Sequence, residues 1–281
     1  MRIILSILLL SVCYSDIHNV PDDYDTIQEA IDASQDSDTV LVAQGIYYEN
    51  LIIEKNITLT SNAMYDDLTE WVEYSYIFGE YQLLNDNIEN TIINGSNDTN
   101  GEDLQSTILI YSSEDECIEP IIFGFTITGG DGTLVPYLGE NIDGYIILLE
   151  EMRGGGILSY NALPTLNYNF IKDNSDDIQS GGALSLSHGD QFERVIGHTN
   201  YSFGRPRCEG DVDLSYNFYR DNDALYGNTL STNGFEGSLD MSHSIYDVYN
   251  CPEEEVTPVW VDVEEDVEVD FQYSAGDLCS I

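Results

Sequence analysis

Basic residues are scarce in this chain. Its 281 residues include 8 Lys and Arg against 52 Asp and Glu, so the formal net charge is −44 with histidine neutral. A surface this acidic repels phosphate backbones and anionic head groups, and the sequence holds no basic stripe that would offset the repulsion. The composition therefore excludes nucleic acid as a partner and argues against docking on anionic membranes.

Long apolar runs are also lacking beyond the N-terminus. Arg2 precedes an apolar run over residues 3–12, which is too short to cross a bilayer and has the length of a signal-peptide core. We therefore expect residues 1–15 to be a signal peptide, and the mature chain to be secreted or at the cell surface without a transmembrane segment. Lipid attachment at Cys13 is the alternative, because residues 10–13 resemble a bacterial lipobox apart from the bulky Val12.

Closely spaced cysteine pairs are missing as well. No two cysteines are separated by only two residues, so the spacing of a zinc site is absent. An even set of four in an exported chain permits two disulfides in about three possible pairings, among which the sequence does not choose. The four cysteines are Cys117, Cys208, Cys251 and Cys279.

Apolar residues nevertheless make up 42% of the chain, which is enough to build a folded core. Thr26 followed by Glu29 is a capping box, and Ile27, Ala30 and Ile31 share one helical face, so a short amphipathic helix is predicted here.

Short strands follow this helix without further helices between them. The pattern predicts strands at 38–43, 48–53 and 56–60. Strands this short, joined by tight bends, are typical of the coils of a solenoid.

A repeat supports this interpretation. The run LNYNFIKDN at 166–174 returns as LSYNFYRDN at 214–222, an offset of 214 − 166 = 48 residues. Asn174 and Asn222 end the two copies, and asparagine both tolerates the left-handed conformation and bonds the backbone of a turn. We expect a ladder of hydrogen bonds between stacked coils, with two ordinary surface turns as the alternative.

The segment from Val20 to Asn50 resembles the N-terminal cap and first coil of many exported members of the right-handed parallel β-helix family, also called the pectin-lyase-like fold. Residues 154–157, 169–171 and 181–184 are similar to later coils of surface and polymorphic outer-membrane repeat proteins. The resemblance implies an all-β, right-handed parallel β-helix solenoid over residues 16–250 with a short N-terminal capping α-helix.

Three segments break the repeat, near 62–90, 131–153 and 188–210, and are predicted to be loop insertions. Function in a solenoid tends to lie on such insertions or on the face beneath them. Residues 251–281 are predicted to be an acidic C-terminal capping segment, since apolar and acidic residues alternate from Val259. The end at Ile281 leaves open that the chain is a piece of a longer protein.

Two catalytic families share motifs with the chain. Residues 45–49, 75–79 and 203–207 resemble three motifs of pectin methylesterases in the right order, but Ser75 stands where that family has a catalytic aspartate. Residues 174–177 and 188–189 resemble polygalacturonase elements, yet the first two of these overlap and cannot stack on one face. An acidic turn followed by a polar loop is the favoured interpretation.

The few basic residues are concentrated. Six of the eight lie between residues 153 and 220, three of them in the 188–210 insertion. Such a cluster predicts contact with a carboxylate or sulfate of a polysaccharide or cell-surface glycan, while internal neutralisation by neighbouring acids is the favoured alternative. The candidate glycan-binding residues are Arg194, Arg205, Arg207 and His188.

Calcium is the cofactor that the composition favours, if there is one. Carboxylate groups cluster in one turn and recur one repeat later, and calcium prefers such hard oxygen ligands. Solvation of an acidic surface would explain the same pattern. The candidate metal ligands are Asp173, Asp176, Asp177, Asp221 and Asp223.

Taken together, these patterns favour an exported, noncatalytic scaffold for cell-surface adhesion or glycan contact. A polysaccharide-active enzyme, pectate-lyase-like or pectin-esterase-like, with its site near the 188–210 insertion, is the alternative.

Overall fold

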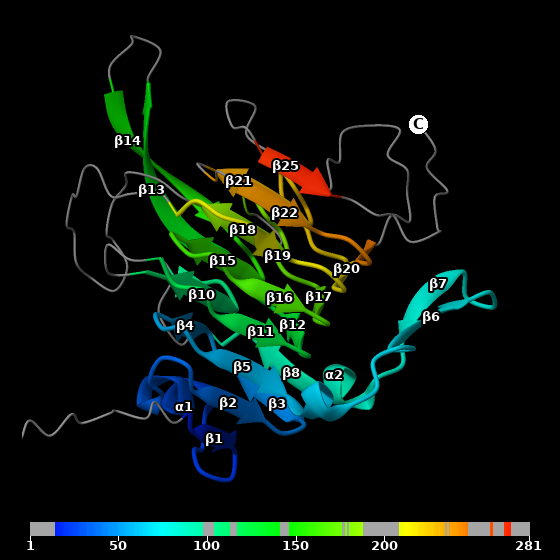
Figure 1. Cartoon of the computed structure of the whole chain (residues 1–281). Helices are drawn as coiled ribbons and strands as arrows, with labels where there is room; N and C mark the ends of the chain where they lie inside the picture. Colours follow the sequence, from blue (N-terminus) through cyan, green and yellow to red (C-terminus); the bar gives the residue numbers. More distant parts are fainter. Residues whose placement is uncertain are drawn as a thin grey trace, which may run out of the picture.

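The chain winds through three parallel sheets whose strands stack one above another (Figure 1). The computed structural model describes residues 15–97, 104–112, 117–140, 146–175, 178, 180–187, 208–233, 235, 237–246, 259–260 and 267–270. Residues 1–14, most of the predicted signal peptide, lie outside these ranges. Among the described residues, no helix has the length and apolar character needed to cross a membrane.

From β2 onward, successive coils contribute strands to the sheets in the same order. Sheet 1 contains β1 (Ile17–Val20), β2 (Thr39–Val42), β5 (Thr58–Ser61), β11 (Ile121–Phe123) and β16 (Thr165–Asn167). Sheet 2 contains β3 (Gly45–Tyr48), β8 (Thr91–Asn94), β12 (Thr126–Thr128), β17 (Phe170–Lys172), β20 (Phe218–Arg220) and β23 (Ile245–Tyr246). Sheet 3 contains β4 (Leu51–Ile53), β10 (Ile108–Tyr111), β15 (Ile157–Tyr160), β18 (Leu184–Ser187), β21 (Leu230–Asn233) and β24 (Val259–Trp260).

The last coils replace sheet 1 by a further parallel sheet, which consists of β19 (Val212–Asp213), β22 (Gly237–Asp240) and β25 (Val267–Asp270). With β19 in contact with β16, the stack continues without a break. The fold is therefore the predicted all-β, right-handed parallel β-helix.

Aliphatic side chains fill the inside of the coils in continuous rows. In sheet 3 the parallel register places Leu51, Ile108, Ile157, Leu184 and Leu230 in one row, and all five are fully buried. Each side chain covers its neighbours in the coils above and below. Burial therefore contributes about 1.5–3 kcal/mol of stability per residue only when the coils are stacked.

The strand predicted over residues 48–53 is wrong. The structure has two strands there, β3 and β4, separated by a corner at Glu49 and Asn50. Asn50 is buried, and its Nδ2 donates a hydrogen bond to the carbonyl of Gly95, 2.8 Å away. A polar side chain that bonds the backbone inside the corner turns the chain from sheet 2 to sheet 3.

The predicted helix is α1 (Ile27–Ala33), and it covers the first coil with Ile27, Ala30 and Ile31 buried. Thr26 is the N-cap and accepts from the backbone N–H of Glu29. The carboxylate of Glu49 accepts from the N–H groups of Ile27 and Gln28, at 3.0 and 2.9 Å.

The C-terminal end of α1 is capped by the side chain of Lys55. The ammonium of Lys55 donates to the carbonyls of Ile31, Asp32 and Ser34, at 2.8–3.0 Å. Both helix ends thus carry the charge that complements the helix dipole.

Asp38 joins this cap to sheet 1. Its carboxylate accepts from the backbone N–H groups of Asp16 and Gln35, both at 2.8 Å, and lies 3.2 Å from Nε2 of His18. These donors, the Gln35 N–H first, hold the pKa of Asp38 below its ordinary value of 3.8.

We expect the Asp38 contacts to stabilise the fold only while the carboxyl is ionised. A lowered folded pKa gives stability that is present above the unfolded pKa and is lost as pH falls through the folded value. The urea midpoint of the wild type should exceed that of Asp38→Asn by a constant margin above about pH 5, and the margin should shrink below the unfolded pKa. A margin independent of pH would contradict the assignment.

Two corners repeat one local geometry in the later coils. At the corner from sheet 1 to sheet 2, a residue with positive φ is followed by an inward polar residue in three coils. The positive-φ residues are Tyr168, Tyr216 and His243, with φ between 56° and 58°, and the inward residues are Asn169, Asn217 and Ser244.

The corner from sheet 2 to sheet 3 follows the same rule, with Asp173 and Asp221 at φ 50° and Asn174 and Asn222 pointing inward. Asn174 Nδ2 donates to Asn222 Oδ1 at 2.9 Å, and Asn222 Nδ2 donates to the carbonyl of Ile171 at 2.9 Å. The predicted asparagine ladder is confirmed, because both side chains are buried and bonded between coils rather than exposed in surface turns.

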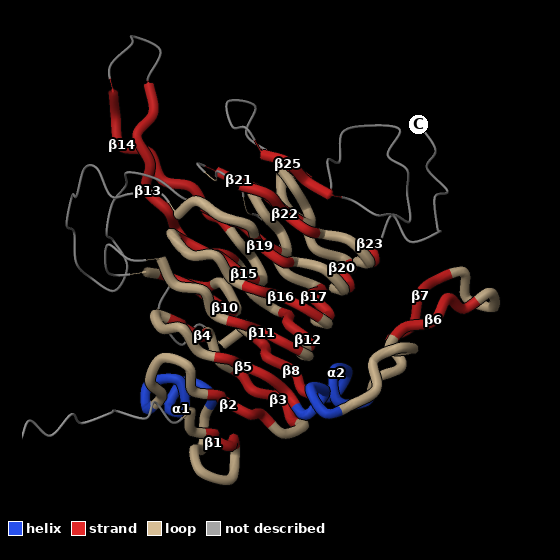
Figure 2. Tube along the Cα trace, viewed as in Figure 1, coloured by secondary structure: helices blue, strands red, loops and turns tan. Residues whose placement is uncertain are grey.

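Two antiparallel hairpins extend from the stack (Figure 2). The first lies between sheets 1 and 2 and comprises η1 (Asn62–Tyr65), β6 (Val72–Ser75), β7 (Glu80–Leu83) and α2 (Asp86–Asn90). The second comprises β13 (Gly132–Glu140) and β14 (Ile146–Arg153), and β13 also pairs with β9 (Leu104–Gln105).

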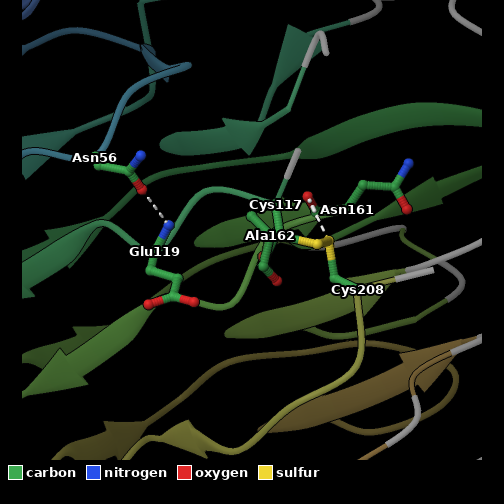
Figure 3. Close-up of a disulfide and its surroundings, with 7 residues drawn as sticks. Asn56, Cys117, Glu119, Asn161, Ala162 and Cys208 are labelled. Atoms are coloured by element: carbon green, nitrogen blue, oxygen red, sulfur yellow. Dashed lines mark hydrogen bonds between the residues drawn. A yellow bond between two sulfur atoms is a disulfide. The ribbon is translucent and has the colours of Figure 1, made fainter. Parts of the chain in front are cut away.

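A disulfide joins Cys117 to Cys208 at the corner from sheet 3 to sheet 1 (Figure 3). The two residues belong to coils separated by one intervening coil, and the Cys208 sulfur lies 3.1 Å from the carbonyl oxygen of Asn161 in that coil. This is one of the pairings that the sequence left open. Cys251 and Cys279 lie outside the described residues.

Candidate functional site

The predicted glycan-binding residues lie outside the described residues. These are Arg194, Arg205, Arg207 and His188. The described chain stops at Ser187, at the end of β18, and resumes at Cys208, whose position is fixed by the disulfide. Ser187 and Cys208, the described residues on either side, lie on the side of the stack where sheet 3 leads to sheet 1.

The described basic residues between 153 and 220 are engaged internally. Arg153 forms an ion pair with Glu151 at 2.8 Å, and Lys172 forms one with Asp173 at 3.0 Å. Arg220 donates to the backbone carbonyl of Tyr81 in the β6–β7 hairpin. Internal neutralisation of the arginines in the 188–210 insertion, by Glu193, Glu209 or Asp211, stays a prediction, because these arginines lie outside the described residues.

The predicted calcium ligands are placed only in part. Asp176 and Asp177 lie outside the described residues, whereas Asp173 and Asp221 follow paired strands and occupy the same corner of adjacent coils. Asp223 lies two residues further on, and its N–H donates to the carbonyl of Asn174 at 3.1 Å. In the described part of the chain, no group of three or more His, Cys, Asp or Glu side chains is arranged to hold a metal ion.

The esterase-like motifs have other roles where the structure describes them. Glu49 of the first motif caps α1, and residues 75–79 of the second form the tip of the β6–β7 hairpin, away from the faces of the three sheets (Figure 1). In the polygalacturonase-like motif Asn174 is fully buried in the ladder, where no substrate reaches it.

A cluster of aromatic side chains that belongs to none of these motifs lies on the outer face of sheet 2 and at its corner with sheet 1. Five side chains from three successive coils form a continuous aromatic row there, which we call the aromatic face. It consists of Tyr168, Phe170, Tyr216, Phe218 and His243.

The rings of the aromatic face stack from coil to coil. Tyr168 and Tyr216 have centroids 5.0 Å apart at an interplanar angle of 13°, and Tyr216 and His243 are 4.6 Å apart at 7°. Phe170 and Phe218 stack beside them at 4.6 Å. The positive φ shared by Tyr168, Tyr216 and His243 turns each ring outward at the same corner, so the coil spacing itself sets the stack.

The β6–β7 insertion closes one side of the aromatic face. Trp71 meets the ring of Tyr168 edge-on at 5.4 Å, and Trp71, Phe170 and Phe218 belong to one buried cluster. The guanidinium of Arg220 lies 4.7 Å above the ring of Phe218, and its bond to Tyr81 ties the hairpin down.

Polar groups border this surface. His243 is exposed and Tyr168 and Tyr216 are half-buried. Burial, and then the adjacent Tyr216, raises the pKa of the Tyr168 hydroxyl, so this group is protonated at neutral pH and can donate a hydrogen bond. Lys172, Asp173 and Asp221 lie along the opposite edge of sheet 2. The arrangement can bind a ligand that offers apolar patches and hydroxyl groups together.

Sequence reasoning did not single out the aromatic face, although a signal for it was present. Tyr168 and Tyr216 occupy the same position in the 48-residue repeat, as do Phe170 and Phe218. In a solenoid, residues at equivalent positions of successive repeats lie one above another. Two aromatic residues at the same repeat position therefore indicate an aromatic row.

Comparisons with known proteins find only distant similarity to solved structures. No family model and no curated protein matches the chain. A pectin methylesterase mutant in complex with a hexasaccharide is similar at 12% identity and a TM-score of 0.38, with 92% of this chain and 66% of that chain covered. The pectin methylesterase from Aspergillus niger is similar at 14% identity and a TM-score of 0.30, with 92% and 85% covered.

Proposed function

We propose that the protein is an exported, noncatalytic β-helix scaffold for cell-surface adhesion or glycan contact, and that the outer rings of the aromatic face, Tyr168, Tyr216 and His243, are its contact surface. The observation that carries the proposal is the stacked row Tyr168, Tyr216 and His243, held at one corner over three coils. A linear polysaccharide offers alternating apolar ring faces and hydroxyl groups, which suit a row of aromatic rings with polar tips. Secretion or surface display is supported by the Cys117–Cys208 disulfide, since disulfides persist in oxidising compartments.

Two sets of residues extend this proposal. Arg194, Arg205, Arg207 and His188 would pair with carboxylate or sulfate groups of an acidic glycan. Calcium held by Asp173, Asp176, Asp177, Asp221 and Asp223 would bridge such a glycan to a protein of charge −44. Without calcium, the like charges of protein and polyuronate repel each other.

A glycan array run with and without calcium tests the function. We expect binding without turnover, and loss of acidic-glycan binding on chelation if calcium forms the bridge. Release of unsaturated or demethylated products from the same polymers would overturn the noncatalytic assignment.

The aromatic face is tested with a double variant, Tyr216→Ala/His243→Ala. Because these two rings form the accessible end of the row, we expect affinity for the bound glycan to fall by at least about tenfold, or 1.4 kcal/mol. The variant Tyr216→Phe keeps the ring and isolates the hydroxyl. Unchanged affinity in a double variant that keeps the wild-type melting temperature would exclude the aromatic face.

A further inference from the structure

The tip of the β6–β7 hairpin exposes three large apolar side chains in succession. Tyr76, Ile77 and Phe78 are 92%, 89% and 67% exposed. They stand on a four-residue turn in which the N–H of Gly79, at φ 75°, donates to the carbonyl of Ser75 at 2.7 Å. This turn connects β6 to β7 at the far end of the hairpin, away from the stack (Figure 1).

The turn does not depend on these side chains, whose packing on the protein includes the edge-on contact of the Tyr76 ring with Tyr74 at 5.2 Å. The turn geometry depends on glycine at position 79, and any polar residues would satisfy the three positions before it. The base of the hairpin is anchored separately, by Trp71 in the buried cluster and by Arg220 on the carbonyl of Tyr81. Three consecutive exposed apolar residues mark a surface that meets an apolar environment.

The hairpin is also acidic and holds no basic residue. Between residues 62 and 90 there are seven acids and no Lys, Arg or His, which makes contact with anionic lipid unfavourable. The acids are Asp66, Asp67, Glu70, Glu73, Glu80, Asp86 and Glu89. The five residues 75–79 at the tip carry no charge.

The size of the tip favours a lipid surface over a protein. Three side chains of this kind bury roughly 600 Å² at most, below the approximately 800 Å² per partner of a stable protein interface. A bilayer interface sets no such minimum and needs no complementary pocket, and tyrosine prefers the depth of the head groups. A second copy of the chain is disfavoured by the repulsion between two charges of −44.

We propose that Tyr76, Ile77 and Phe78 insert reversibly into the interface of a zwitterionic bilayer. The hairpin holds the acidic body away from the surface, and affinity comes from apolar insertion without attraction between charges. This inference is independent of the glycan contact at the aromatic face.

Flotation of the full-length mature protein with phosphatidylcholine vesicles tests the proposal. We expect the wild type to float with these vesicles and to float less as phosphatidylserine is added. Ile77→Asp/Phe78→Asp should lower the partition constant by at least about tenfold, because it places two charges in the apolar interface. Added salt should not release the protein, since no ion pair holds it.

Leu225→Asp is the matched control, because Leu225 is 67% exposed on the body of the stack and lies outside the hairpin. It should float like the wild type. A wild type that does not float, or a double variant that floats equally well, would overturn the proposal. A dimer by light scattering that the double variant abolishes would assign the tip to a second copy instead and would also overturn it.

Discussion

Asn217→Ala is expected to lower the free energy of unfolding by about 4 kcal/mol. Asn217 is fully buried, and its Nδ2 donates to the carbonyls of Leu166 and Leu214, at 2.6 and 2.8 Å. Its Oδ1 accepts from the backbone N–H of Asn169 at 3.0 Å. Alanine leaves these groups of two adjacent coils buried without partners, and each unsatisfied group costs about 1–3 kcal/mol. Urea unfolding followed by circular dichroism measures the change.

Two further variants identify the cause. Asn90→Ala removes an exposed side chain of the same type, which donates only to the carbonyl of Asp86, and should change stability by no more than about 0.5 kcal/mol. Asn217→Asp keeps the volume but directs a carboxylate at carbonyl oxygens. Its pKa in the folded state is then raised, so its stability should recover relative to the wild type as pH falls. If Asn217→Ala unfolds at the wild-type midpoint, the hydrogen bonds of Asn217 do not hold the coils together.

The repeat is the part of the fold that the sequence predicts well. The offset of 48 residues pairs Phe170 with Phe218 in the structure, as it does in the alignment of the two copies. It also places Asn174 under Asn222, and the structure joins their side chains. A solenoid makes such inference reliable because equivalent positions in consecutive coils must touch.

The prediction fails where one local pattern fits two environments. Residues 48–53 are compatible with one strand, and nothing local shows that Asn50 bonds the carbonyl of Gly95 in the next coil. Residues 76–78 belong to the segment near 62–90 that is predicted to be a loop insertion, but their apolar composition alone does not show that they are exposed. Their exposure depends on where the hairpin leaves the stack, which is a property of the assembled coils.

The pairing of the cysteines could not be predicted from the sequence either, because four cysteines allow three pairings and the composition is the same for all of them. The structure brings the Cα atoms of Cys117 and Cys208 to 5.7 Å from a sequence separation of 91 residues. Every contact inside the closed loop is more local than the bridge itself. Removing the disulfide therefore acts mainly on the unfolded state, which gains conformational entropy when this long loop is no longer closed.

We expect Cys117→Ser/Cys208→Ser to lower the free energy of unfolding by about 3–4 kcal/mol. The variant should still fold, because the rows of aliphatic side chains and the buried asparagines at the corners are retained. Its circular dichroism at low temperature should match that of the wild type. Cys251→Ser/Cys279→Ser is the matched control, with the same chemistry at two cysteines outside the bridge. If both double variants lose equal stability, the effect is not specific to the loop between residues 117 and 208. If only the first does, the covalent tie between the coils on either side of Asn161 is what stabilises this part of the stack.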